Sequence, residues 1–279
     1  MSYKSLVVHL DTSDRAHSRL EFALRLARQF DAHLTGVFAV YTPEPSSFYV
    51  MAGSADYFRE HQQWRDQRFA ALERLFHAET MRAKVPSRWI TADARANSTV
   101  PHHARHADLV IVGQRNPDDP ETFIDDQFPE NLVLSAGRPV LFVPYAGEFA
   151  SVGERVLVAW DGSREAVRAA HDAIPFLERA KRTTVVAVTG AGDDEADWRI
   201  PGADAAQMLA RHAPDVNVLD IAGAPDTPVG DTLLSRAYET GSDLLVMGAY
   251  GHTRWRELLM GGVTRTVLAS MTLPVLMSH

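Results

Sequence analysis

The sequence predicts an α/β fold of two tandem, five-stranded parallel sheets, each covered by helices on both faces. Short apolar runs, typical of buried parallel strands, alternate with amphipathic segments along the chain. This alternation occurs twice, with matching landmarks in the two halves. The length of 279 residues also suits two domains, each large enough to bury its own core.

The internal repeat is marked by three pairs of matching residues. These are Asp11 with Asp161, Gly113 with Gly248, and Pro139 with Pro274. The first pair is separated by 150 positions and the other two by 135, so the first half contains additional residues. The simplest place for them is 41–83, an aromatic and charged stretch that we expect to form a longer loop and an extended helix.

Two domains are therefore expected, at residues 1–146 and 153–279. The linker is predicted at Tyr145–Glu154, because this segment holds Gly147 and Gly153 and shows no hydrophobic periodicity. Each domain then carries one copy of the repeat.

The elements can be assigned in order along the second half. A strand at Val156–Trp160, matching Leu6–Leu10 in the first half, is followed by a helix that Ser163 can cap. The apolar face of this helix has the spacing of a core-facing stripe, formed by Ala166, Ala170, Ala173, Ile174 and Leu177. Pro175 should kink the helix, because it lacks a backbone N–H. Further strands are predicted at Thr184–Val188, Val216–Ile221, Leu244–Met247 and Val275–Met277.

Composition argues against several classes of partner. The net charge of −8 is unlike that of a nucleic-acid-binding surface, which is usually basic. Without cysteine there is no disulfide framework and no thiolate metal site. No apolar run approaches the roughly 18 residues of a membrane span, and the first residues do not resemble a signal peptide. We expect a cytoplasmic protein that binds neither nucleic acid nor membrane.

The segment after the predicted strand Leu244–Met247 has the features of a phosphate site. Gly248 and Gly251 form a turn, and Gly261 and Gly262 open a helix. Glycines let the backbone approach a ligand closely, because no Cβ atom is in the way. The start of a helix offers unpaired N–H groups and the positive end of its dipole.

The strand order also brings an acidic residue to this loop. In a five-stranded sheet of order 3-2-1-4-5, strands 1 and 4 flank the crevice where ligands bind. In the second half, strand 1 ends at Asp161 and strand 4 at Gly248, so the two should meet. The carboxylate could accept a hydrogen bond from a sugar hydroxyl or a base amine. The alternative is that Asp161, Gly162 and Ser163 form only a strand-to-helix turn with a cap.

These residues resemble those of the universal stress protein family. The resemblance covers essentially the whole chain, as two tandem copies. It lies in the Gly-x-x-Gly turn with a glycine ten positions later, the aspartate after strand 1, and the closing Leu-Pro-Val-Leu strand. It implies a Rossmann-like sandwich and, as in many members, binding of ATP or AMP. The family usually has serine or threonine where this chain has Gly262, and Thr264 lies nearby but one turn position later.

By this resemblance, the second half binds one adenine nucleotide, ATP or AMP, with Mg²⁺ as an optional companion. The implied site residues surround the base, the ribose and the phosphates. They are Ala159, Trp160 and Asp161 beside base and ribose, Val188 or its neighbour Ala187 beside adenine, and Met247, Gly248, Gly251, Gly261, Gly262 and Val263 beside the phosphates. No catalytic residue and no metal ligand is predicted.

The first half departs from this pattern. Asn116, Asp126 and Gln127 stand where the second half has its second, third and fourth glycines. Five carboxylates lie where phosphates would bind, at Asp118, Asp119, Glu121, Asp125 and Asp126. Because like charges repel, we expect no nucleotide here. A solvated acidic loop is preferred to one that holds a divalent cation.

Two further groups of side chains could bind a metal ion or a phosphate. His102 and His106, with His103 between them, lie on a predicted helix at a spacing that can place two imidazoles on one metal ion. Without an evident third ligand, a solvated helix face is preferred. Three arginines bracket the glycine loop and could reach a phosphate, although solvent is the preferred environment: Arg254, Arg256 and Arg265.

The resemblance therefore implies a stress-response regulator. We expect weak ATP hydrolysis at most, since no GxSxG, HExxH or Walker motif is present. We expect the two halves to pair through the edge strands Val140–Val143 and Val275–Met277, with a homodimer as a further assembly. Two alternatives stay open. One is a slow nucleotide hydrolase or transferase, and the other is a binding module for a non-nucleotide ligand or a partner protein.

Overall fold

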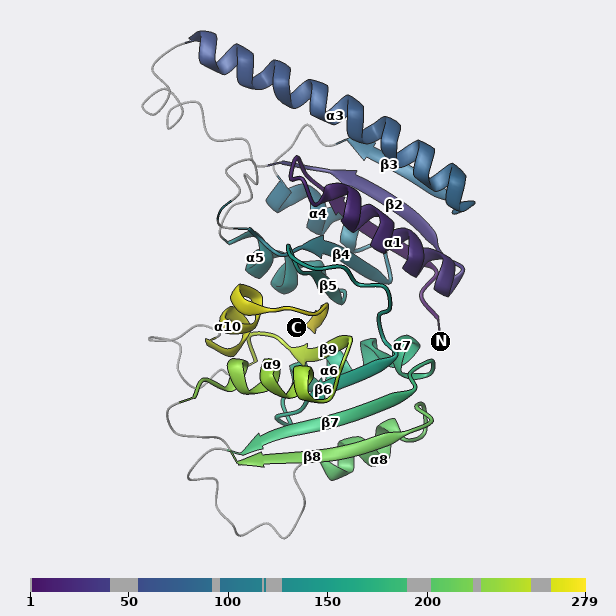
Figure 1. Cartoon of the computed structure of the whole chain (residues 1–279), viewed down its shortest axis with the longest axis vertical. Helices are drawn as coiled ribbons and strands as arrows, with labels where there is room; N and C mark the ends of the chain where they lie inside the picture. The colour runs from purple at the N-terminus through teal and green to yellow at the C-terminus, as the bar shows by residue number, and fades with distance from the viewer. Residues whose placement is uncertain are drawn as a thin grey trace. The chain divides into compact units, whose positions relative to one another are not determined.

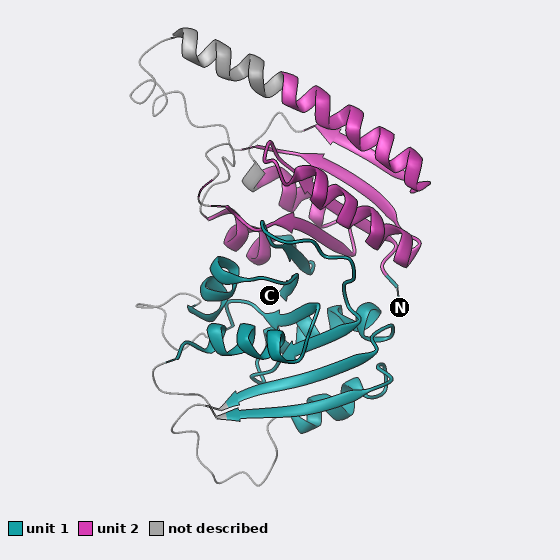
Figure 2. Cartoon of the chain, viewed as in Figure 1, with its two compact units in different colours: residues 1–2, 136–279 teal, residues 3–135 magenta. Residues whose placement is uncertain are grey.

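The computed structural model describes most of the chain as two compact units. The described residues are 2–40, 55–91, 96–116, 118, 127–189, 202–222, 227–251 and 262–279. One unit comprises residues 3–135, and the other comprises residues 136–279 with the first two residues (Figure 2). Each contains a parallel sheet with helices packed against it (Figure 1), which confirms the predicted fold class.

In the unit 3–135, the strands lie in the order β3-β2-β1-β4, and all of them are parallel. The strands are β1 (Ser5–Leu10), β2 (His33–Phe38), β3 (Ser87–Thr91) and β4 (Leu109–Gly113). The helices are α1 (Ala16–Phe30), α3 (Ala55–Ala83), α4 (Ala96–Ala104) and α5 (Phe128–Ala136). This is the predicted order for the first four strands of the repeat.

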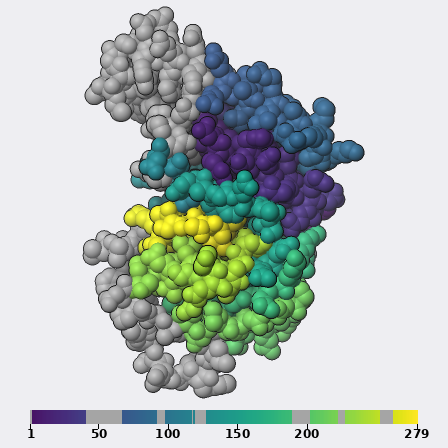
Figure 3. Space-filling view, viewed as in Figure 1, coloured from purple at the N-terminus to yellow at the C-terminus, as the bar shows by residue number. Residues whose placement is uncertain are grey.

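The additional residues of the first half form the long helix α3, as expected; the remainder, 41–54, lies outside the described residues. The ring centroids of Phe76 on α3 and Trp89 on β3 are 5.0 Å apart. A Cβ atom on Gly36 would come within 2.6 Å of the Phe76 ring. The small residue thus lets α3 pack closely on β2 and β3. Its outer side stays at the surface (Figure 3), with Met81 80% exposed. No described helix, α3 included, combines the length and apolar character needed to cross a membrane.

The unit 136–279 contains a complete copy of the predicted sheet, in the order β8-β7-β6-β9-β10 (Figure 1). Its parallel strands are β6 (Arg155–Ala159), β7 (Arg182–Thr189), β8 (Val216–Ala222), β9 (Leu244–Gly248) and β10 (Val275–Ser278). The helices are α6 (Arg164–Asp172), α7 (Ile174–Leu177), α8 (Ala203–Leu209), α9 (Val229–Glu239) and α10 (Gly262–Ser270). A sixth strand, β5 (Val140–Val143), pairs antiparallel with β10, Leu141 lying opposite Leu276.

The helix after β6 follows its sequence signals closely. The hydroxyl of Ser163 caps it by accepting the N–H of Ala166 at 3.1 Å. All five residues of the predicted apolar stripe are buried. At Pro175 the helix does more than kink, because α6 ends at Asp172 and a new short helix begins at Ile174. Pro175 then lies in the first turn of α7, where its missing N–H has no helical partner to lose.

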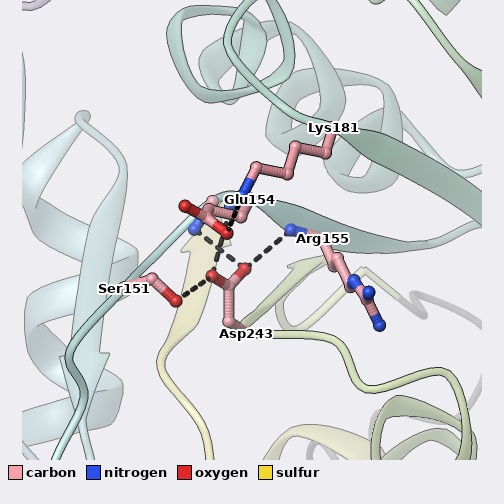
Figure 4. Close-up of polar contacts among 6 residues, drawn as sticks. Ser151, Glu154, Arg155, Lys181 and Asp243 are labelled. Atoms are coloured by element: carbon pink, nitrogen blue, oxygen red, sulfur yellow. Dashed lines mark hydrogen bonds and ion pairs between the residues drawn. The ribbon is translucent and has the colours of Figure 1, made fainter.

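The linker contains neither helix nor strand, as predicted, and one carboxylate fixes its end. Asp243, just before β9, accepts four hydrogen bonds at 2.9–3.2 Å (Figure 4). The donors are the backbone N–H groups of Gly153, Glu154 and Arg155 and the hydroxyl of Ser151. These bonds tie the start of β6 to the start of β9, the two strands whose opposite ends form the candidate site.

Candidate functional site

The candidate site lies where β6 and β9 end, at the carboxyl edge of the second sheet. The two strands are parallel neighbours, with Val156 opposite Leu244. The turn that follows β6 packs directly against the end of β9. A Cβ atom on Gly248 would lie 2.5 Å from the backbone nitrogen of Ala166, so only glycine allows this approach. The helix that follows the acidic turn therefore begins against the end of β9, and the meeting of Asp161 itself with the glycine loop stays a prediction.

Asp161 is exposed and begins this turn. Its Oδ1 accepts the backbone N–H of Ser163 at 2.9 Å. The turn-and-cap structure considered as the alternative is therefore present. It does not exclude a ligand, because a carboxylate can accept several hydrogen bonds.

Glu165 is a residue of this edge that the sequence interpretation missed. It is 8% exposed, and its Oε2 lies 2.7 Å from the point where a Cβ atom on Gly251 would stand. Its Oε1 is 3.4 Å from Nε of Arg164. An acid in the first turn of a helix ordinarily complements the helix dipole, so the sequence alone gives no reason to single it out. Its position places a negative charge beside the loop that was predicted to receive phosphates.

Thr264 contacts the start of the glycine loop at Tyr250. Tyr250 has a φ of +57°, which is uncommon for a residue other than glycine, and its N–H donates to Oγ1 of Thr264 at 3.4 Å. Thr264 is 3% exposed. Its hydroxyl therefore supports the loop from beneath.

Gly262 is the exposed first residue of α10, and a Cβ atom added there would meet no atom of the described residues within 4 Å. Space alone does not explain why serine is missing from this position. The first N–H groups of a helix have no partner within it, so the start of α10 retains the main-chain donors that suit an anion. Val263 follows, half-buried, and Arg265 is exposed. Gly261, Arg254 and Arg256 lie outside the described residues.

The residues predicted to contact the base lie along the ends of β6 and β7. The N–H of Trp160 donates to the carbonyl of Val186 at 2.8 Å. A Cβ atom on Gly202 would lie 3.8 Å from the Cβ of Ala187 and 3.9 Å from Cδ1 of Trp160. These two predicted residues therefore lie near one point of the edge.

The other predicted residues differ in how much of each side chain faces outward. Ala159 and Val188 are half-buried, whereas Met247 is 4% exposed. The side chain of Met247 therefore belongs to the core, and its backbone carries the chain into the glycine loop.

The corresponding edge of the first unit is filled by an ion pair. Asp11, the counterpart of Asp161, is 1% exposed, and its Oδ1 lies 2.6 Å from Nη2 of Arg19 and 2.5 Å from the hydroxyl of Ser13. The guanidinium occupies the space that a Cβ atom on Gly113 would need. The sequence interpretation missed Arg19. The sequence feature that could have identified Arg19 is a charged residue on the otherwise apolar face of its helix.

The charges of this cluster influence one another. Burial raises the pKa of Asp11. The charges of Arg19 and His9 and the hydrogen bonds from Ser13 and Arg19 lower it by more, so the pKa lies below its usual value. His9 is fully buried and its Nε2 is 2.7 Å from the carbonyl oxygen of Ala39. Burial lowers the pKa of His9; Asp11 opposes this and Arg19 reinforces it. The first unit therefore holds an internal cation against its strand-1 carboxylate.

The remaining groups are the acidic loop of the first half and the histidines near α4. Within the acidic loop, Asp118 is exposed and donates its N–H to Oδ1 of Asn116 at 3.1 Å, whereas 119–126 lie outside the described residues. His106 was expected on a helix, but α4 ends at Ala104 and His106 lies in the following turn. Within the described ranges, no group of three or more histidine or acidic side chains could hold a metal ion.

Comparison with known proteins gives the same repeat. The sequence model of the universal stress protein family matches residues 2–144 and 153–279. A universal stress protein from Archaeoglobus fulgidus DSM 4304 has a similar structure, with a TM-score of 0.70, 16% identity, and coverage of 98% of this chain and 97% of its own. A functionally unknown protein from Pseudomonas aeruginosa PAO1 has a TM-score of 0.63 and 17% identity, with coverage of 99% and 92%. No curated protein sequence matches the chain. The two family matches span nearly its whole length, and the chain belongs to the universal stress protein family as a tandem, two-domain member.

Proposed function

We propose that this chain is a stress-response regulator whose second half binds one adenine nucleotide, ATP or AMP. The observation that carries the proposal is the contact between the turn after β6 and the glycine loop after β9. In this arrangement the start of α10 binds the phosphates, and the carboxylate of Asp161 accepts a hydrogen bond from a ribose hydroxyl. Trp160 and Ala187 flank the base. The family resemblance noted in the sequence supports the same assignment.

Glu165 gives the proposed site a reason to favour a cation together with ATP. Its carboxylate is packed against Gly251, beside the proposed phosphate position. Two negative groups that lie close together repel each other. A divalent ion such as Mg²⁺ prefers oxygen ligands and would offset this repulsion when it accompanies ATP. We therefore propose that Mg²⁺ strengthens ATP binding.

The first half is proposed to bind no nucleotide. Its strand-1 carboxylate is buried and neutralised by Arg19, whereas the second half has the small residue Ala169 150 positions later. The guanidinium also takes up the space beside Gly113. This half then serves as a structural or regulatory partner of the nucleotide-binding half.

The proposal extends to the organisation of the chain. It includes domains at 1–146 and 153–279, pairing of the two halves, a further homodimer, and a cytoplasmic location. The strand β5 belongs to the first half of the sequence but extends the sheet of the second by pairing with β10, which supports the pairing of the halves.

The test is calorimetric titration of the full chain with ATP and AMP, each with and without Mg²⁺. We expect one site per chain, lost in Gly262→Glu, whose new carboxylate repels phosphate and whose Cβ atom meets no described residue within 4 Å. Gln127→Glu places the same charge at the matching position of the first half and should leave binding unchanged. Two sites per chain, or loss of binding in Gln127→Glu alone, would show that the first half binds nucleotide.

The same samples distinguish the alternatives. Steady consumption of ATP with Mg²⁺, abolished in Gly262→Glu, would favour the slow hydrolase. If neither nucleotide produces heat, mass spectrometry of small molecules that copurify with the chain would test for a non-nucleotide ligand, and the nucleotide proposal would be abandoned.

A further inference from the structure

A small pocket of about 110 Å³ lies in the unit 3–135, away from the carboxyl edge of its sheet. Strands β1, β2 and β3 form its floor, and the end of α4 with the following turn forms its wall. Its lining includes five residues with polar side chains, which are Ser5, Thr35, Arg88, His103 and His106. The hydroxyl of Ser5 donates to the carbonyl oxygen of His106 at 3.4 Å. None of these five residues belongs to the edge that matches the nucleotide site.

The sheet places these groups on one face. Val7 is opposite Thr35, and Thr35 is opposite Arg88, so the three residues form a row across adjacent strands. Ser5 lies two residues before Val7 and therefore points to the same side of the sheet. The short helix α4 ends at Ala104, and Arg88, at the end of the row, remains exposed. The pocket is consequently open to solvent.

Among the described residues, the lining contains cationic groups and no carboxylate. His103 is close to two further imidazoles and to Arg88. The ring centroid of His102 is 5.2 Å from that of His103 and 5.7 Å from that of His106. Burial lowers the pKa of His103, and the nearby His102, Arg88 and His106 lower it further. The cluster therefore disfavours added protons in the absence of a counter-ion.

The charged groups around the pocket do not supply that counter-ion. Among the described carboxylates, Asp108 lies just before β4, and its Oδ2 accepts the backbone N–H groups of Lys4 and Ser5 at 2.7 and 2.9 Å. The ammonium of Lys4 is paired with Asp31 at 3.1 Å. Further titratable or basic side chains on the neighbouring segments include His33 on β2 and Arg105 after α4.

We infer that this pocket binds a small tetrahedral oxyanion of the phosphate or sulfate class, and that binding strengthens as the pH falls. Arginine offers a planar fork of donors to such an anion, protonated imidazoles offer N–H donors, and the hydroxyls complete the shell. The volume is well below the roughly 300–1,000 Å³ of pockets that hold larger organic ligands. The anion is therefore free, or is the phosphate group of a molecule whose remainder stays in solvent.

The test is NMR of the histidine rings of the full chain during titration with sulfate, whose charge stays constant over the range used. We expect saturable shifts of His103 and His106. A one-unit rise in one imidazole pKa on binding corresponds to at most about tenfold in affinity, reached well below both pKa values, so sulfate should bind severalfold more tightly near about pH 5.5 than near about pH 7.5. Unchanged rings, or equal affinity at both pH values, would overturn the inference.

Two arginine variants separate a built site from general surface charge. Arg88→Gln should weaken sulfate binding at least about tenfold, the usual size of one lost charge-assisted hydrogen bond. Arg82→Gln removes an exposed arginine of the same unit that pairs with Glu79 and should change nothing. Equal weakening in both variants would show that sulfate senses only the general charge of the surface.

A third variant and a second probe complete the design. His103→Asn should reduce the pH dependence while thermal unfolding confirms that the chain is folded. AMP distinguishes the two sources of the anion. If AMP also shifts His103, the pocket accepts a phosphate carried by a larger molecule; if sulfate alone does, it takes the free anion. Sulfate shifts confined to residues near Gly262 would contradict the assignment.

Discussion

The guanidinium of Arg19 occupies the space into which a Cβ atom on Gly113 would project. A Gly113→Ala substitution must therefore displace a buried ion pair. We expect it to destabilise the first unit by about 1–3 kcal/mol, as overpacking of a filled core does. Urea unfolding of the full chain would measure this. Gly262→Ala, where the added methyl group meets no described residue within 4 Å, is the control and should unfold like the wild type.

Removal of Arg19 itself should have an effect that depends on pH. In Arg19→Met, Asp11 stays buried without its cation, which should cost about 3–5 kcal/mol near neutral pH. The wild-type pKa of Asp11 is lowered, so its contribution to stability is present above the unfolded pKa of 3.8 and lost as the pH falls through the lower folded value. In the variant, burial instead favours the protonated acid.

The difference in unfolding free energy between wild type and Arg19→Met should therefore shrink as the solution is acidified. Denaturant unfolding at a series of pH values would measure it. A difference that stays constant with pH would mean that lost packing, and not the unpaired charge of Asp11, accounts for the destabilisation.

Local signals in the sequence were sufficient for most of the fold. Ser163, the apolar stripe after it and the break at Pro175 follow from capping, helical spacing and the missing proline N–H, which depend on near neighbours in the chain. The strand order then placed the acidic turn against the glycine loop. Arg19 and Glu165 were missed because their roles depend on Gly113 and Gly251, far away in sequence, and a single helical charge ordinarily indicates a solvated position.

Asp243 should matter for stability and not for binding. Asp243→Ala removes the charged acceptor of four hydrogen bonds at the start of β6. Since the residue is only half-buried, we expect a loss of about 2 kcal/mol, below the sum of such bonds. Asp215→Ala, which breaks an exposed ion pair with Arg182, should cost less than about 1 kcal/mol. Equal losses in thermal or urea unfolding would contradict the role assigned to Asp243.

Glu165 should determine how strongly ATP binding depends on Mg²⁺. Glu165→Gln keeps the shape of the side chain but removes the charge beside Gly251. We expect ATP to bind about fivefold to tenfold more tightly without Mg²⁺, and the benefit of Mg²⁺ to decrease, because the repulsion is gone. Glu239→Gln, at the exposed end of α9, is the control. A variant that loses the benefit of Mg²⁺ and also binds ATP more weakly would identify Glu165 as a cation ligand instead.

The missing hydroxyl can be restored by substitution of Gly262, since a Cβ atom there meets no described residue within 4 Å. In Gly262→Ser, the new hydroxyl stands at the start of α10 and can donate to a phosphate. A hydrogen bond to a charged group is worth about 1.5–3 kcal/mol, so the affinity for AMP should rise at least about tenfold by calorimetry. Gly262→Ala adds the same Cβ without the hydroxyl and should bind like the wild type. If alanine strengthens binding as much as serine does, the gain comes from stiffening the helix start, and the phosphate does not lie within reach of residue 262.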